Sequence, residues 1–181
     1  MIILDEIVSV DGWAARANGA IDFFVEREGV VETVGAAHRM ASVAAVLLGA
    51  ETYREFSAYW PTQDPTLHVN SLPKHVLSAT LEEAPWGDMP AATIERGDAV
   101  AVARALEQHC RGDIIVWGSL TLAEALLAGG VVDEVWLRVV PVTIGVGRSF
   151  WPAADLDVRL VETQRHPEGW ATARYEIDRR N

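Results

Sequence analysis

Two places in the sequence join an apolar, strand-like run to a helix-like pattern through a glycine. The first junction contains Gly49 and Thr52, and the second contains Gly118, Ser119 and Thr121. A helix N-terminus presents free backbone N–H groups, and a residue without a Cβ lets an anion approach them closely. The three hydroxyl side chains can add further donors. This spacing indicates binding of a phosphate or another anion, although Ser and Thr at such positions also serve as ordinary helix caps.

A third segment that could do chemistry follows the N-terminal strand pattern and contains Asp11, Gly12 and Trp13. A carboxylate and an indole in a loop at a strand end could lie over a planar ligand. The alternative is structural, because Asp-Gly is a common turn pair and Trp13 could simply cover the core. Taken alone, this segment is more typical of a turn than of a site.

Other chemical signatures are missing from the sequence. The stretch Gly145-Val-Gly-Arg-Ser-Phe150 has Phe where a dinucleotide fingerprint has its third glycine, and Ser119 lacks the flanking glycines of a hydrolase nucleophile. The five histidines are scattered and Cys110 is the only cysteine, so neither a metal site nor a disulfide is predicted. These absences disfavour hydrolases and metalloenzymes.

The composition limits the possible partners. The chain has 181 residues, half of them hydrophobic, and 15 Lys and Arg against 26 Asp and Glu give a net charge of −11. Without a basic block, neither nucleic acid nor an anionic membrane surface is expected as a partner. The longest nearly apolar run, residues 40–50, is shorter than the ~20 residues of a membrane span, and the first residues do not resemble a signal peptide. We therefore expect one domain over residues 1–181, in the cytoplasm.

Apolar runs and amphipathic periods predict the elements that must position these residues. Strands that alternate with helices in most of the chain indicate an α/β protein with a parallel sheet covered on both faces. The C-terminal third has strand patterns without intervening helices, and a turn with Pro and Gly at residues 166–169 indicates an antiparallel edge. Strands are predicted over residues 2–10, 43–48, 75–77, 114–117, 135–140, 158–163 and 171–177, and helices over residues 31–41, 52–58, 99–110 and 120–127.

The order of these segments resembles the dihydrofolate reductase-like superfamily, and more narrowly the stand-alone relatives of the reductase domain of the riboflavin-biosynthesis protein RibD. The resemblance extends over most of the chain, residues 2–177, and depends on the ordered set of segments. They are Ser9-Val-Asp-Gly-Trp-Ala-Ala15, Ala45-Val-Leu-Leu-Gly-Ala-Glu-Thr-Tyr53, Trp60-Pro61, Leu72-Pro-Lys-His-Val-Leu-Ser-Ala-Thr-Leu81, Val116-Trp-Gly-Ser-Leu-Thr-Leu122 and residues 132–145.

This resemblance implies a three-layer α/β/α fold with a mixed, mostly parallel sheet of about eight strands that ends in a C-terminal antiparallel hairpin. It also implies NADPH bound across the carboxyl edges of the strands, and hydride transfer to a small molecule. The substrate would be a pterin such as dihydrofolate, or a ribosylamino-pyrimidine of the riboflavin pathway. Relatives often form homodimers. The residues carried over to the cofactor by position are Gly49, Thr52, Ser78, Thr80, Trp117, Gly118, Ser119, Leu120 and Thr121.

The resemblance also suggests candidate catalytic residues. It places the loop over residues 10–20 above nicotinamide and substrate, with Trp13 in that loop and Asp11 at the substrate pocket, as in the riboflavin-type members. In folate-reducing relatives a carboxylate on the first helix holds the pterin, and Glu32 is the nearest candidate on the helix predicted here, with Asp22 and Glu28 in the loop before it. The helix dipole also favours an acid near a helix start, so Glu32 has a structural explanation as well. Arg138, within an apolar strand pattern, must find an anion or water in the cleft or at a subunit partner.

Two alanines depart from the family pattern. Ala50 and Ala79 stand where many relatives carry basic residues that meet the adenosine 2′-phosphate of NADPH. Charge-assisted hydrogen bonds of this kind contribute ~1.5–3 kcal/mol each. Their loss leaves open weak NADPH binding, use of NADH, compensation by Arg54 or Lys74, or a decayed cofactor site. The last possibility corresponds to an alternative function, a dimeric binding module on the same fold without useful reductase activity.

Overall fold

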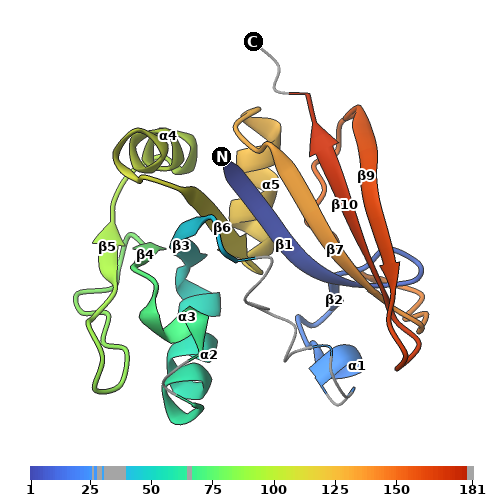
Figure 1. Ribbon diagram of the computed structural model, residues 1–181, viewed down its shortest axis with the longest axis horizontal. Coiled ribbons are helices and arrows are strands. Elements are labelled where there is room, and N and C mark those ends of the chain that lie inside the picture. Colours follow the sequence, from blue (N-terminus) through green and yellow to red (C-terminus); the bar gives the residue numbers. More distant parts are fainter. Residues whose placement is uncertain (26, 28–29, 31–39, 65–66, 179–181) are drawn as a thin grey trace.

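The computed structural model of the chain describes residues 1–25, 27, 30, 40–64 and 67–178. Within these residues, eight strands form one sheet in the order β5-β4-β3-β6-β1-β7-β10-β9 (Figure 1). Two further short strands, β2 and β8, pair with each other. The strands are β1 (Ile2–Ser9), β2 (Ala15–Arg16), β3 (Val43–Gly49), β4 (Lys74–Leu77), β5 (Thr93–Glu95), β6 (Asp113–Trp117), β7 (Glu134–Val140), β8 (Gly147–Arg148), β9 (Val158–Arg165) and β10 (Ala171–Ile177).

The sheet is parallel from β5 to β7 and antiparallel at its other edge. β1 pairs in parallel with β6 and β7, and β3 pairs in parallel with β4 and β6. β10 runs antiparallel to both β7 and β9. The turn between β9 and β10 contains Gly169 with φ +93°, a left-handed conformation that glycine adopts readily. The predicted mixed sheet with a C-terminal hairpin is confirmed.

Helices cover both faces of this sheet, which makes the fold a three-layer α/β/α sandwich. Alternate residues of β1 point to opposite faces. Ile3 packs in the cluster that contains Tyr53 and Val69, whereas Ile2 and Leu4 pack in the cluster under α4 and α5. The helical elements are α1 (Asp22–Val25), α2 (Ala50–Tyr59), the 3₁₀ helix η1 (Trp60–Thr62), α3 (His68–Ser71), α4 (Ala99–His109) and α5 (Leu120–Ala128).

The predicted elements that fall on described residues agree with the structure, with small shifts at their ends. The helix expected over 52–58 begins at Ala50 because α2 starts directly after Gly49. The sequence did not predict β2, β5, β8, α1, η1 or α3, because segments of two to four residues show no readable period. The helix predicted over 31–41 lies outside the described residues except at positions 40 and 41, which are not helical.

The length of a helix limits whether it can cross a membrane. Among the described residues, no helix is long and apolar enough to cross a membrane.

The central strand β6 offers a test of the described core. Ile115 is fully buried there, so Ile115→Ala should lower the free energy of unfolding by about 2–5 kcal/mol through lost contacts and a residual cavity. Leu160→Ala on the edge strand β9, where the residue is 52% exposed, should change it by no more than ~0.5 kcal/mol. Urea denaturation followed by tryptophan fluorescence measures both variants, and equal losses would contradict this core.

Candidate functional site

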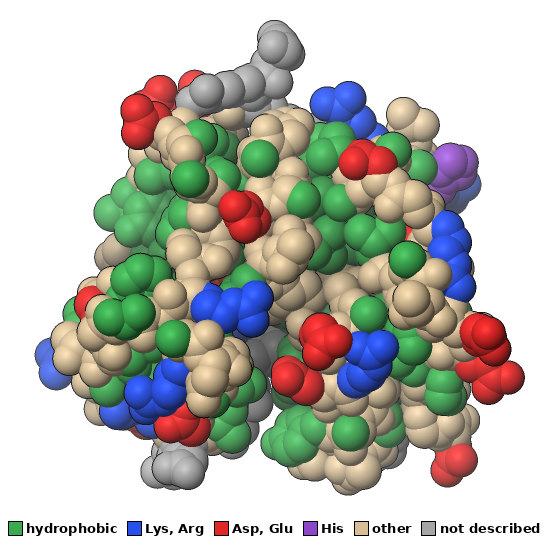
Figure 2. All heavy atoms as spheres, turned by 180° about the vertical axis from the view of Figure 1, so that it is seen from behind, with side chains coloured by type: hydrophobic (Ala, Val, Ile, Leu, Met, Phe, Trp, Pro, Cys, Tyr) green, Lys and Arg blue, Asp and Glu red, His purple; other side chains and the backbone are tan. Residues whose placement is uncertain are grey.

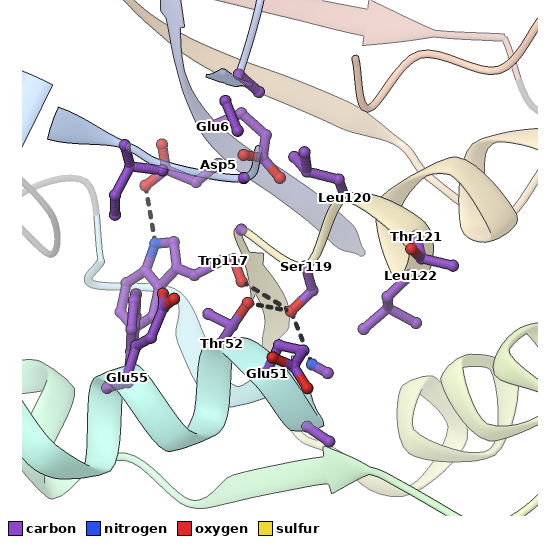
Figure 3. Close-up of a pocket in the computed structure, with 18 of the residues that line it drawn as sticks. Asp5, Glu6, Glu51, Thr52, Glu55, Trp117, Ser119, Leu120, Thr121 and Leu122 are labelled. Carbon is purple, nitrogen blue, oxygen red and sulfur yellow. Dashed lines mark hydrogen bonds between the residues drawn. The ribbon is translucent and has the colours of Figure 1, made fainter. Parts of the chain in front are cut away.

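A cavity of about 790 Å³ opens at the carboxyl ends of β3 and β6. Its wall is formed by β1 and β7, by the first turns of α2, α4 and α5, and by parts of the segment 14–25. Figure 3 shows side chains from these elements around one opening. Open α/β sheets place ligands at this edge, and the volume suits a cofactor together with a small substrate.

The two glycine junctions meet in this cavity through the hydroxyl of Ser119. Its Oγ accepts a hydrogen bond from the Gly49 N–H at 2.8 Å and donates one to Thr52 Oγ1 at 2.8 Å (Figure 3). A Cβ at Gly49 would lie 3.1 Å from Ser119 Oγ, and a Cβ at Gly118 would lie 3.3 Å from Thr52 Cγ2. A side chain at either glycine would thus crowd the opposing junction.

The chain turns from β6 into α5 through two consecutive left-handed residues. Gly118 has φ +53°, and Ser119 has φ +60°, which is uncommon for a residue with a side chain. The Ser119 hydroxyl is engaged with the other junction, so it does not cap α5. This turn leaves the first N–H groups of α5 without a side-chain cap, at the wall of the cavity.

Two of the three helix N-termini at the cavity lack a side-chain cap. α2 begins after Gly49 and α5 after Ser119, in both cases without a capping hydrogen bond from the side chain. α4 is different, because the Asp98 carboxylate accepts a hydrogen bond from the Ala101 N–H at 3.0 Å. The open ends of α2 and α5 can therefore bind an anion, whereas an acid already occupies the end of α4.

Charged side chains around the cavity do not form a basic site. The wall includes Glu51, Glu55 and Asp98, and its cations among the described residues are Arg138 and Arg148. On the face shown in Figure 2, basic and acidic side chains are interspersed. Among the described residues there is also no cluster of three or more His, Cys, Asp or Glu that could hold a metal ion.

A buried ion pair lies at the β1 and β7 side of the cavity. The Arg138 guanidinium donates a hydrogen bond to Asp5 Oδ2, and the Trp117 indole N–H donates to the same oxygen at 2.9 Å. Asp5 is 6% exposed and Arg138 is 3% exposed. The anion that an arginine in an apolar strand requires is thus supplied by β1. Arg138 Nε is buried and has no hydrogen-bond partner in the described part of the chain.

Glu6 is the second acid of β1 at the cavity, and it differs from Asp5 in its surroundings. The residue is 4% exposed, and its Oε1 is buried without a hydrogen-bond partner among the described residues. Burial, helped by the neighbouring Asp5 charge and opposed by Arg138, raises the pKa of Glu6 from 4.5 to about 8. Its carboxyl is therefore mostly protonated at neutral pH.

The cavity wall contains seven of the nine residues predicted to bind a cofactor. These are Gly49, Thr52, Trp117, Gly118, Ser119, Leu120 and Thr121. Ser78 and Thr80 are not part of the wall; the Ser78 hydroxyl accepts hydrogen bonds from the N–H groups of Thr80 and Leu81 at 3.2 and 3.1 Å. The sequence analysis did not single out Asp5 and Glu6 as site residues. The only feature of the sequence that marks them is that two acids lie within an otherwise apolar strand.

Asp11 and Trp13, two of the three residues predicted to be catalytic, also lie away from this wall. The Asp11 carboxylate accepts hydrogen bonds from the backbone N–H groups of Ile144 and Gly145 at 3.2 and 2.8 Å. The Trp13 N–H donates to Ser9 Oγ at 3.0 Å, and its side chain approaches Gly147. Both residues thus hold the loop whose next residues, 14 and 15, do line the cavity. Glu32 lies outside the described residues.

The cations that were candidates to compensate for Ala50 and Ala79 are engaged elsewhere. Arg54 pairs with Glu51 at 2.7 Å. Lys74 is buried; its Nζ donates to the Asn70 carbonyl at 2.7 Å and lies 4.7 Å from the centroid of the Trp86 ring. A further cation, which the sequence analysis missed, is Arg96, whose guanidinium donates to the Ser78 and Leu81 carbonyls beside Ala79.

The raised pKa of Glu6 should make stability depend on pH. The unfolded chain loses this proton near pH 4.5 and the folded protein near pH 8, so the folded state binds more protons between these values. The Glu6 contribution is therefore complete below pH 4.5, and the free energy of unfolding falls by up to ~1.4 kcal/mol per unit as the pH rises to 8.

Urea denaturation of the wild type and of Glu6→Gln between pH 4 and 9 isolates this contribution. The difference between their free energies of unfolding should change with pH up to about pH 8 and then level off. A difference that does not depend on pH would contradict the assignment.

Comparison of the sequence with known proteins identifies relatives of this chain. The sequence profile of the RibD C-terminal domain matches residues 1–172. The uncharacterized protein YyaP of Bacillus subtilis (strain 168) is 25% identical over 177 residues, which are 93% of this chain and 90% of YyaP.

Two solved structures share the fold. A pyrimidine reductase-like protein of Corynebacterium diphtheriae has a TM-score of 0.69 at 15% identity, over 99% of this chain and 92% of that chain. Dihydrofolate reductase of Enterococcus faecalis, complexed with NADP(H), has a TM-score of 0.66 at 11% identity, over 98% and 96% of the two chains. By its sequence, the chain belongs to the RibD C-terminal domain family, and it has the dihydrofolate reductase-like fold.

Proposed function

We propose that the protein is a reductase that transfers hydride from a reduced nicotinamide nucleotide, NADPH or NADH, to a small heteroaromatic or imine-like substrate. The observation that carries this proposal is the convergence of two uncapped helix N-termini on one cavity, next to buried carboxyl groups. Family membership and the dinucleotide bound to the Enterococcus reductase support it. A homodimer in the cytoplasm is part of the same proposal.

The residues at the β6 to α5 turn fit the diphosphate of such a nucleotide. The missing side chain at Gly118 admits an oxygen anion close to the backbone, and the N–H groups of Leu120 and Thr121 belong to an uncapped helix end. The overall charge of −11 gives the anion no attraction at long range. Binding must therefore depend on these local donors. When bound, the cofactor supplies the hydride, and the protein supplies orientation and exclusion of water.

The ion pair between Asp5 on β1 and Arg138 on β7 matches the hydrogen-bonding groups of the proposed substrates. Asp5 offers acceptor atoms and Arg138 offers donors, including the unpartnered Nε, at one side of the cavity. A planar ring with adjacent N–H and C=O groups, as in a pterin or an aminopyrimidine, carries the complementary pair. Dihydrofolate and the 5-amino-6-(5-phosphoribosylamino)uracil of the riboflavin pathway are the substrates to test. In this proposal Asp11 and Trp13 shape the loop that borders the substrate.

Nucleotide binding tests the function directly. NADPH or NADH should quench tryptophan fluorescence saturably, because Trp117 lines the cavity. Gly118→Ala should weaken this binding about tenfold or more, since the new Cβ would lie 3.3 Å from Thr52 Cγ2 and would displace the left-handed turn that holds the first N–H groups of α5. Gly169→Ala is the matched control: it also has positive φ, so it bears similar backbone strain, but it lies in the distant β9–β10 turn. Saturable binding that Gly118→Ala leaves unchanged would refute this placement, and no saturable signal with either nucleotide would refute the reductase.

Restoring a cation at position 50 tests the origin of cofactor preference. Ala50 is the first residue of α2 and lines the cavity. Ala50→Arg should tighten NADPH binding by about tenfold or more, because a charge-assisted contact to the 2′-phosphate is worth ~1.5–3 kcal/mol. NADH, which lacks that phosphate, should bind as before. A gain of equal size for both nucleotides, in the same fluorescence titration, would mean that position 50 does not meet the 2′-phosphate.

A further inference from the structure

We propose that Glu6 is the proton donor of the reduction, because its carboxyl belongs to the wall of the cavity that Asp5 and Arg138 also line. This inference rests on the proposed function and adds to it the residue that completes the chemistry. Hydride transfer to a polarised double bond requires a proton at the other atom. Among the described residues, Glu6 is the carboxyl at the cavity whose buried oxygen has no partner.

The position of Glu6 follows from the unequal lengths of two neighbouring strands. The ladder between β1 and β6 ends at the pair Asp5–Trp117, whereas β1 continues beside β7 as far as Ser9. Glu6 is thus the first residue of β1 beyond the end of β6, where the open strand edge borders the cavity. Figure 3 shows its carboxyl on the side of Leu120, and the Asp5 carboxyl on the side of Trp117.

The unpartnered oxygen distinguishes Glu6 from a structural acid. A buried polar atom without a hydrogen bond destabilises the folded state, and native proteins pair nearly all such atoms. Asp5, on the same strand, is satisfied by Arg138 and Trp117. No described residue forms such a hydrogen bond with Glu6 Oε1. Glu6 belongs to the cavity wall, and a bound substrate is the partner that the proposal assigns to its carboxyl.

The charges around Glu6 favour its neutral form. Asp5, one residue away, repels a second negative charge, and Arg138 on β7 compensates only in part. The other charged groups of the cavity wall are Glu51 and Glu55 on α2, Asp98 before α4, and Arg148 on β8. Acids outnumber bases on the wall, and their negative charge and the burial of Glu6 both favour its protonated form. Two adjacent carboxyls thus take different roles, one paired with Arg138 and the other holding a proton.

The proposed step balances in atoms and electrons. Hydride from the reduced nicotinamide forms a new C–H bond at the carbon of a C=N group, and the π electron pair moves to nitrogen. Nitrogen takes the proton from the Glu6 carboxyl, so an N–H bond forms as the Glu6 O–H bond breaks. The substrate is reduced, the nucleotide is oxidised, and Glu6 remains as a carboxylate that regains its proton from water.

The first arm of the test reads the proton on Glu6 without turnover. Protein labelled with ¹³C at the glutamate carboxyls is titrated by NMR, and the resonance of Glu6 is the one missing from Glu6→Gln. The proposal expects a midpoint near pH 8. A midpoint below pH 6 would overturn it, because Glu6 would then be ionised at working pH.

The second arm measures hydride transfer in single turnovers with NADPH or NADH and each of the two substrates named above. Glu6→Gln should lose at least about 100-fold in rate while its nucleotide affinity stays within about threefold. The wild-type rate should fall above pH 8, and Glu6→Asp, which keeps an acid, should recover part of the rate and this dependence. Glu134→Gln is the matched control, since Glu134 is also buried on a strand but pairs with Trp136 and Arg174 outside the cavity wall.

The outcomes separate the two proposals. A Glu6→Gln protein that binds nucleotide and transfers hydride at the wild-type rate would overturn the role of Glu6 and leave the reductase intact. A wild-type protein that binds neither nucleotide would overturn the reductase, and with it the role of Glu6, even if the NMR midpoint lies near pH 8.

Discussion

The early end of β6 is the constraint on which the rest of the site depends. β6 stops at Trp117, and residues 6–9 of β1 continue with β7 alone as their neighbour. The chain leaves the sheet through the left-handed pair Gly118 and Ser119, and it enters α5 at once. One change of direction thus opens the cavity, exposes the edge of β1 to it, and aims the uncapped end of α5 into it. Two hydrogen bonds at the Ser119 hydroxyl, one accepted from the Gly49 N–H and one donated to Thr52 Oγ1, hold this arrangement in place.

The charged groups at the site are unevenly distributed, and each acts mainly on its immediate neighbours. The chain is acidic overall, and the cavity wall carries more acids than bases. An anionic cofactor would therefore depend on backbone N–H groups, whose partial charges do not change the net charge of the wall. The acids have separate environments: Asp5 is paired with Arg138, Asp98 caps α4, and Glu6 is kept neutral by burial. A cavity with this distribution offers anion binding at one end and proton transfer near β1.

Much of the fold could be predicted from the sequence, because long apolar runs mark the inner strands, an amphipathic period marks α4, and glycines mark both ends of α5. The glycine junctions at Gly49 and Gly118 were also predictable one at a time. Their contact through Ser119 was not, since it requires β3 and β6, which are distant in sequence, to be neighbours in the sheet. Glu6 was missed for a similar reason. Its burial and its access to the cavity depend on where β6 ends, and an acid within an apolar run does not reveal this.

A crystal structure of the protein with bound NADPH or NADH would test the central claim most directly. We expect the diphosphate against the backbone of residues 118–121, and the nicotinamide ring at the open edge of β1, with its reactive face toward the space beside Glu6. Electron density for the nucleotide elsewhere on the surface, or a cavity that contains only solvent at saturating nucleotide, would contradict it.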